Sequence, residues 1–268
     1  MHYLRAGSGA PPLVFVHGFG CSHEDWLLQI KELKGSFEVL ACDLRGHGLT
    51  PGRPHECSIA HYGGDVAALL SVLDLEKLVL IGHSMGCRVV LEAARLAPER
   101  IAGLVLIDGS RLATGDADAA ENAARAAIGK AGYPAFAGNL FRQMFFSPSP
   151  LAEAIVARAM RQSAEIGSAL WPRMARWDAG EMDEALAAVR SPLMAIQSTT
   201  RDPVLLKRAP LKAGDTSPWL DLLRKAVPGA RIEIVPGVGH FTQLEAPAKV
   251  NQLIQELVQS FRTIGGTK

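Results

Sequence analysis

Charge of one sign and long apolar runs are both missing from this chain. Its 28 Lys and Arg residues nearly balance its 27 Asp and Glu residues, which leaves a net charge of +1. Without a basic stripe or an acidic tail, nucleic acid and anionic membranes are disfavoured as partners. The N-terminus lacks an apolar run of signal-peptide length, and nowhere do about 18 uncharged apolar residues follow one another. These absences predict a cytoplasmic protein with neither nucleic acid nor a membrane as its partner.

Cysteine is scarce too, and none of the four residues has CxxC or Cys/His ligand spacing. A structural zinc site would need such spacing, and a disulfide framework would need a denser and more regular set. We therefore expect reduced thiols, mainly in packing roles, at Cys21, Cys42, Cys57 and Cys87. Nothing in the sequence implies a metal or an organic cofactor.

What the chain does contain is a regular alternation of apolar runs and amphipathic segments. Its apolar content of 48% is enough for a buried core. Continuous apolar strands that alternate with helices predict an α/β fold, with a mostly parallel sheet and helices on both faces. Ligands of such sheets bind beyond the carboxyl ends of the strands. We expect strands at 3–5, 13–16, 37–42, 78–81, 102–107, 192–197 and 231–235, and helices at 23–33, 58–73, 85–96, 217–227 and 246–264.

The alternation is interrupted between residues 112 and 189, where Ala-rich helical stretches replace strands. We expect a helical cap at residues 112–185, inserted into a core formed by residues 1–111 and 186–268. The cap is rich in phenylalanine and methionine. Most of these side chains are needed to pack the cap itself, and the rest are available to line an apolar pocket over the carboxyl edge of the sheet.

A serine lies where one of the expected strands turns into a helix. Residues 82–86 read Gly-His-Ser-Met-Gly, which fits the G-x-S-x-G pattern of a nucleophile elbow. At a positive φ, the backbone of Ser84 brings the strand and the helix so close that side chains at positions 82 and 86 would collide. The motif predicts that the hydroxyl of Ser84 projects above the sheet edge.

A serine nucleophile needs a base within hydrogen-bond reach and a third group that orients the base. His240 is the preferred base because it follows the last strand, at the same edge as Ser84. His17 and His47 also lie at strand ends, but each sits inside a glycine turn. His83 adjoins the serine along the elbow and is expected to point away from it.

The oxyanion that develops during acyl transfer needs two fixed N–H donors. Met85 opens the helix after the serine and offers one through its backbone. Phe19, in the glycine turn 17–20, is best placed to offer the other.

Four motifs in this order resemble those of the α/β-hydrolase superfamily, in its small serine esterase-like branch with a helical cap. They are His-Gly-Phe-Gly at 17–20, Asp-Leu-Arg-Gly-His-Gly at 43–48, the elbow at 82–86 and Gly-His-Phe at 239–241. The resemblance covers nearly the whole chain and implies a Ser-His-Asp triad and a mainly structural loop at 43–48. Family members usually open with a two-strand hairpin, whereas only its second strand is expected here.

The acid of the triad is left open between two aspartates. Family members usually carry it a few residues beyond the strand after the cap, often as Gly-x-x-Asp. Here a serine replaces the glycine, and Asp202 comes one residue late and unusually far before His240. Asp108 ends the preceding strand, to which the acid has migrated in some family members. Asp108 is slightly preferred.

A serine at the elbow excludes the haloalkane dehalogenase and epoxide hydrolase branches, which need a carboxylate there. We therefore expect hydrolysis of carboxylic esters with small apolar acyl or aryl groups, by way of an acyl-enzyme. The alternatives are a carbon–carbon bond hydrolase or a lactonase on the same triad, and a non-catalytic receptor for a small ligand. An arginine that holds a substrate carboxylate would favour carbon–carbon bond hydrolysis, and the candidates are Arg88, Arg111 and Arg142. The sequence does not decide between a monomer and a homo-oligomer.

Overall fold

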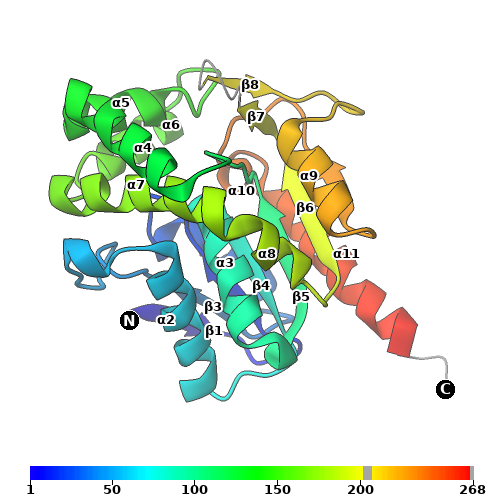
Figure 1. The fold of residues 1–268 in the computed structure, drawn as a ribbon. Helices are drawn as coiled ribbons and strands as arrows, with labels where there is room; N and C mark the ends of the chain where they lie inside the picture. The colour runs from blue at the N-terminus through cyan, green and yellow to red at the C-terminus, as the bar shows by residue number, and fades with distance from the viewer. Residues whose placement is uncertain (202–206, 266–268) are drawn as a thin grey trace.

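The computed structural model describes residues 1–201 and 207–265, which form an α/β fold around one large sheet (Figure 1). The sheet has seven strands in the order β1-β3-β2-β4-β5-β6-β9. β1 pairs with β3 in the antiparallel sense, and all other neighbours are parallel. The predicted fold class is therefore confirmed. The strands are Tyr3–Ala6 (β1), Leu13–Val16 (β2), Val39–Cys42 (β3), Leu78–His83 (β4), Ile101–Ile107 (β5), Leu193–Gln197 (β6) and Arg231–Ile234 (β9).

Helices cover both faces of this sheet. Successive side chains of a strand point to opposite faces, and alternate residues of β2 accordingly belong to two separate hydrophobic clusters. Because both faces are buried, β2 and β3 have no exposed residue. One cluster includes side chains of α2 (Ile59–Val72), α3 (Met85–Leu96) and α9 (Pro218–Ala226), and the other includes side chains of α1 (Leu27–Leu33) and α11 (Pro247–Gly265).

Two helices of the core, α2 and α9, begin at a serine whose side chain supplies a cap. The hydroxyl of Ser58 accepts a hydrogen bond from the His61 N–H at the start of α2, and Ser217 does the same for Leu220 in α9. The helix expected at 23–33 divides into a short 3-10 helix, His23–Trp26, and α1. Three further short elements are the 3-10 helices Pro54–Glu56 and Pro98–Arg100 and the helix α10, Thr242–Glu245.

A helical layer separates β5 from β6 in the chain, as expected, and lies over the carboxyl ends of the strands (Figure 1). A small antiparallel pair, β7 (Thr199–Arg201) and β8 (Arg208–Pro210), follows β6 and was not predicted. Each strand of the pair has three residues, too few for a periodic pattern. The division into a cap at 112–185 and a core remains a prediction. The inserted helices are α4 (Ala117–Ala131), α5 (Tyr133–Arg142), α6 (Pro150–Ala159), α7 (Ala164–Gly180) and α8 (Met182–Ala187).

The parallel register brings the ends of β4, β5 and β6 together. The backbone N–H of Ser84 donates to the carbonyl of Ile107 (2.9 Å), and that of Asp108 donates to the carbonyl of Ile196 (2.8 Å). The residues that follow the three strands are therefore neighbours in space although they lie far apart in the sequence.

The four cysteines are buried and unpaired. Within the described residues, no helix combines the length and the apolar character that crossing a bilayer requires.

Candidate active site

Ser84 occupies a strained turn between β4 and α3, with φ 55° and ψ −112°. This φ lies in the region that non-glycine residues rarely adopt. A Cβ atom on Gly82 would lie 2.3 Å from the carbonyl oxygen of Gly86, and one on Gly86 would lie 2.3 Å from that of Val16. The strand and the helix can therefore approach this closely only because both flanking residues lack a side chain.

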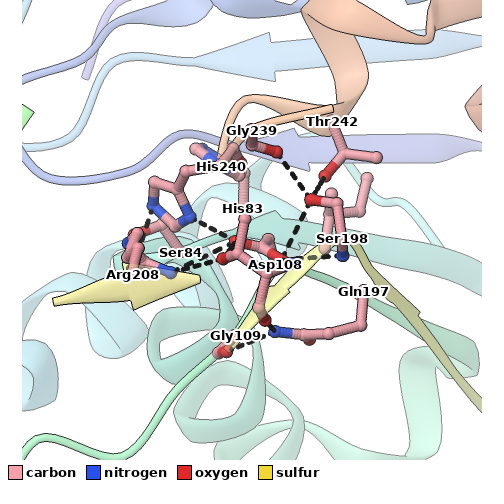
Figure 2. Close-up of polar contacts among 12 residues, drawn as sticks. His83, Ser84, Asp108, Gly109, Gln197, Ser198, Arg208, Gly239, His240 and Thr242 are labelled. Carbon is pink, nitrogen blue, oxygen red and sulfur yellow. Dashed lines mark hydrogen bonds and ion pairs between the residues drawn. The ribbon is translucent and has the colours of Figure 1, made fainter. Parts of the chain in front are cut away.

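Asp108 and His240 form a buried hydrogen-bonded pair beside this turn (Figure 2). The imidazole Nδ1–H of His240 donates to Oδ2 of Asp108 over 2.5 Å. The other oxygen, Oδ1, accepts hydrogen bonds from the backbone N–H groups of Ser198 (2.9 Å) and Thr199 (2.8 Å) and from the Ser198 hydroxyl (3.1 Å). Residues at the ends of two strands thus hold the carboxylate in one orientation, with its second oxygen toward the imidazole.

The environment keeps Asp108 ionised. Burial by itself would raise the pKa of this carboxyl, but the hydrogen bond and charge of His240, together with the charge of Arg208, lower it to about 2. The guanidinium of Arg208 is itself buried and lies 3.2 Å from Oδ2 of Asp108. Asp108 is therefore a carboxylate at neutral pH.

His240 is neutral at the same pH. Burial, and after it the positive charge of Arg208, lower the pKa of His240 to about 4. Because Nδ1 carries the proton that is donated to Asp108, Nε2 is left as an acceptor. Nη2 of Arg208 lies 3.5 Å from this Nε2. Among the described residues, no hydrogen bond joins the Ser84 hydroxyl to His240, although both line the same pocket.

The two expected oxyanion donors lie on either side of the serine. Met85 is the first residue of α3, and the N–H of a first helical residue has no acceptor within its helix. Phe19 follows Gly18, whose added Cβ would lie 3.2 Å from the Cβ of Ser84, so this turn packs directly against the serine.

The other histidines considered in the sequence have different surroundings. Nε2 of His17 accepts the backbone N–H of Leu44, and Nδ1 of His47 donates to the Arg45 carbonyl. Neither ring lines the pocket. His83 donates to the backbone carbonyl of His240 over 2.9 Å, which holds the loop that carries His240.

The second candidate for the acid and the three arginines proposed to hold a substrate carboxylate are found in different places. Asp202 lies outside the described residues. Arg88 lines the pocket, but its Nε and Nη2 both donate to the buried carboxylate of Asp178 (2.7 Å each). Arg111 forms an ion pair with Asp183, and Arg142 lies on the cap surface.

Sequence reasoning did not place Arg208 or Arg201 in the pocket, which both residues line, and it considered Arg201 only as a possible ion-pair partner of Asp202. Each belongs to the small β7–β8 pair, which that reasoning also missed. The only signal in the sequence was their position just after β6, at the sheet edge where Ser84 was expected.

The pocket is narrow, with about 20 Å³ open to the centre of a water molecule. Its floor is the edge of the sheet with Ser84 and His240. Its roof is apolar and comes from the inserted helices, with Leu140, Phe141, Met144, Trp171 and Met174. This roof agrees with the expectation that some apolar side chains of the insertion face a ligand site.

Comparison with known proteins gives the family. The model of the alpha/beta hydrolase family matches residues 13–253. The chain belongs to this family. Its structure superimposes on a thermophilic esterase from Thermogutta terrifontis, solved with malate bound, with a TM-score of 0.79 and 25% identity, covering 97% of this chain and 93% of that one.

Two curated relatives show how the similarity is distributed. An uncharacterized protein of Mycobacterium bovis is 28% identical over 95% of this chain and 77% of its own length. The dihydrolipoyllysine-residue acetyltransferase component of an acetoin cleaving system from Cupriavidus necator is 35% identical over 117 residues, or 44% of this chain. That match covers 31% of the longer protein, so this chain spans about a third of that relative's length.

Proposed function

We propose that this hydrolase cleaves carboxylic esters through an acyl-enzyme on Ser84. The observation that carries the proposal is the buried Asp108–His240 hydrogen bond at the edge of the pocket that Ser84 also lines. A strained serine, a neutral imidazole and an ionised carboxylate are the three groups that acyl transfer to water requires. The esterase from Thermogutta terrifontis, similar over nearly its whole length, supports the same reaction class.

In the first half of the reaction, the hydroxyl oxygen of Ser84 attacks the ester carbonyl while Nε2 of His240 takes its proton. The backbone N–H groups of Phe19 and Met85 stabilise the tetrahedral oxyanion. The imidazolium then gives the proton to the leaving alkoxide, and the alcohol departs. In the second half, His240 deprotonates a water molecule that attacks the acyl-enzyme, and the same proton returns to Ser84 as the acid is released.

Asp108 has the role of the acid in this scheme. Its 2.5 Å hydrogen bond keeps the proton of His240 on Nδ1, and its charge stabilises the imidazolium that forms during each half of the reaction. The four donors on Asp108 other than His240 and Arg208 come from residues 198 and 199, directly after β6. These contacts explain how an acid after β5 can replace one after β6.

The proposed substrates have a small apolar acyl or aryl part, because the roof of the pocket is built from aromatic and aliphatic side chains. The second candidate activity is carbon–carbon bond hydrolysis or lactone opening on the same triad. The observation that favours it is the presence of Arg88, Arg201 and Arg208 in the pocket lining, since such substrates commonly need a cationic partner.

The test is hydrolysis of 4-nitrophenyl esters of acetate to hexanoate by the wild-type protein and by Ser84→Ala. We expect multiple turnovers by the wild type and a fall of about 10⁴-fold or more in the variant. Comparable turnover by both proteins would contradict the proposal. Ligand binding without multiple turnover by the wild type would favour the receptor alternative.

A further inference from the structure

Arg201, the last residue of β7, brings a positive charge to the pocket that Ser84 lines. Its guanidinium lies 5.6 Å from the ring centroid of Trp171, on the cap helix α7. Among the described residues, no carboxylate lies within ion-pair distance of it. The aromatic ring orients the guanidinium, but a ring face does not replace a carboxylate.

The charges around the pocket do not cancel. Arg88 is neutralised by Asp178, which it binds in a bidentate manner. Arg208 shares the carboxylate of Asp108 with His240, whose imidazole is neutral. Within the described part of the chain, the three arginines that line the pocket thus face two carboxylates, and the charge of Arg201 is left over.

A half-buried charge that meets no carboxylate among the described residues is costly, since water no longer fully solvates the ion. Burial and the neighbouring charges of Arg208 and Arg88 lower the pKa of Arg201, but only to about 10. The side chain therefore remains a cation at neutral pH. A negatively charged group that enters the pocket can compensate this charge.

Arg201 is also reachable from outside. Together with Ser110 and Leu112, it lines both the pocket with Ser84 and a neighbouring, more open hollow that Trp219 borders. The guanidinium thus lines the same pocket as the serine and also faces the more open hollow.

We propose that the substrate carries a carboxylate, remote from the ester bond, that binds to Arg201. The inference rests on the proposed function for the position of the ester at Ser84. A planar carboxylate matches the two parallel N–H groups of a guanidinium, and the Trp171 ring holds that guanidinium in place. The substrate class thus becomes an ester with one carboxylate on its acyl or its alcohol part, and with an apolar body between the scissile bond and that negative end.

The first experiment compares pairs of esters that differ only in this charge. Mono-4-nitrophenyl adipate is compared with its terminal amide, and 3-carboxyphenyl butyrate with 3-carbamoylphenyl butyrate, after subtraction of the uncatalysed rates. The two pairs place the carboxylate on the acyl side and on the alcohol side. We expect the wild type to prefer the carboxylate in at least one pair by about 10- to 100-fold in kcat/KM.

The variants assign this preference to one side chain. Arg201→Gln is expected to remove the preference, mainly by raising KM for the anionic ester, while the neutral ester changes by less than about 2-fold. Arg201→Lys should restore part of it, because the charge remains without the planar geometry. Arg142→Gln, at an exposed arginine on the cap outside the pocket lining, is the matched control and should leave both esters unchanged.

Two results would overturn the inference. One is a wild type that shows no preference for the carboxylate in either pair. The other is an equal loss on both members of a pair in Arg201→Gln. If Ser84-dependent turnover of the neutral esters persists in these cases, the proposed function stands and only the substrate class is wrong.

If none of the four esters is turned over, the proposed function is wrong. The inference about Arg201 is then tested by ligand binding. Calorimetric titration with 4-phenylbutyrate and with 4-phenylbutyramide then replaces kinetics. Tighter binding of the carboxylate by the wild type, lost in Arg201→Gln, supports the inference. Equal affinities contradict it.

Discussion

Two buried aspartates end strands of the same sheet, and each binds histidine. Asp43 follows β3 and accepts from Nδ1 of His23 (2.9 Å) and of His2 (3.0 Å), whereas Asp108 follows β5 and accepts from His240 (2.5 Å). Both carboxyls are fully buried, and both have lowered pKa values. The difference lies in what surrounds the imidazole.

The partners of Asp43 serve its own loop. Besides the two histidines, it binds the backbone N–H groups of His23 and Leu49, and a Cβ on Gly48 would lie 2.3 Å from its carboxyl carbon. The ring of His2 is partly exposed, with no strained serine beside it. The imidazole of His240 is buried and shares a pocket with Ser84. A buried Asp–His pair is therefore a common way to close a loop, and it is the adjoining serine turn and pocket that mark Asp108 as a candidate for catalysis.

The largest expected effect separates the two aspartates directly. Asp108→Asn should lower kcat by about 10⁴-fold with little change in KM, because the neutral amide no longer fixes the tautomer or stabilises the imidazolium. Asp43→Asn should leave kcat within about 2-fold and lower the free energy of unfolding by about 1–3 kcal/mol. Ester hydrolysis measures the change in kcat, and urea unfolding measures the change in the free energy of unfolding. Asp202→Asn is the further comparison, and a large loss of activity there with none in Asp108→Asn would reverse the assignment.

The strained serine turn, which Asp43 lacks, depends on the glycines that flank Ser84. Gly86→Ala should lower the free energy of unfolding by about 3 kcal/mol or more, since its Cβ would lie 2.3 Å from the backbone oxygen of Val16. The matched control is Gly129→Ala in α4, where a Cβ would meet nothing within 4 Å and where alanine favours the helix by about 0.5–1 kcal/mol. Urea unfolding of both variants checks this, and equal stabilities would show that the elbow tolerates a side chain.

His47, in the loop that Asp43 begins, predicts an effect of pH on the free energy of unfolding. Burial lowers the pKa of His47 to about 4. The unfolded chain takes up this proton near pH 6.5 and the folded chain near pH 4, so acidification through this interval favours unfolding. We expect a loss on the order of 1–3 kcal/mol from this group between pH 7 and 4. His47→Gln should flatten the dependence measured by urea unfolding, and an unchanged slope would contradict the prediction.

The smallest expected effect concerns the cation that Asp108 has and Asp43 lacks. After burial, the charge of Arg208 is the largest cause of the low pKa of His240. Because activity requires neutral His240, the acid limb of the pH–rate profile should lie near pH 4 in the wild type. Arg208→Gln should shift it to higher pH by about 1 unit, whereas Arg208→Lys should keep it nearer its original position. The profile of kcat/KM measures the shift, and coincident limbs in all three proteins would show that Arg208 does not tune the base.

Local patterns in the sequence were sufficient for the strands of the large sheet, most of the helices and the elbow. The apolar run Leu13–Val16 follows from the general rule that a parallel sheet is buried on both faces. The glycines at 82 and 86 follow from contacts within a few residues of the serine. The placement of His240 after the last strand follows from the same rule, because parallel strands end at one edge.

Only the tertiary structure brought Asp108 into contact with His240, 132 residues away in the chain. It also decided which arginines reach the pocket. Arg88 was expected as a candidate but is neutralised by Asp178 from the cap, whereas Arg201 and Arg208 come from a strand pair too short to leave a pattern. The physical reason is that charge pairing and orientation depend on neighbours from other elements, and no local periodicity records which side chains those neighbours supply.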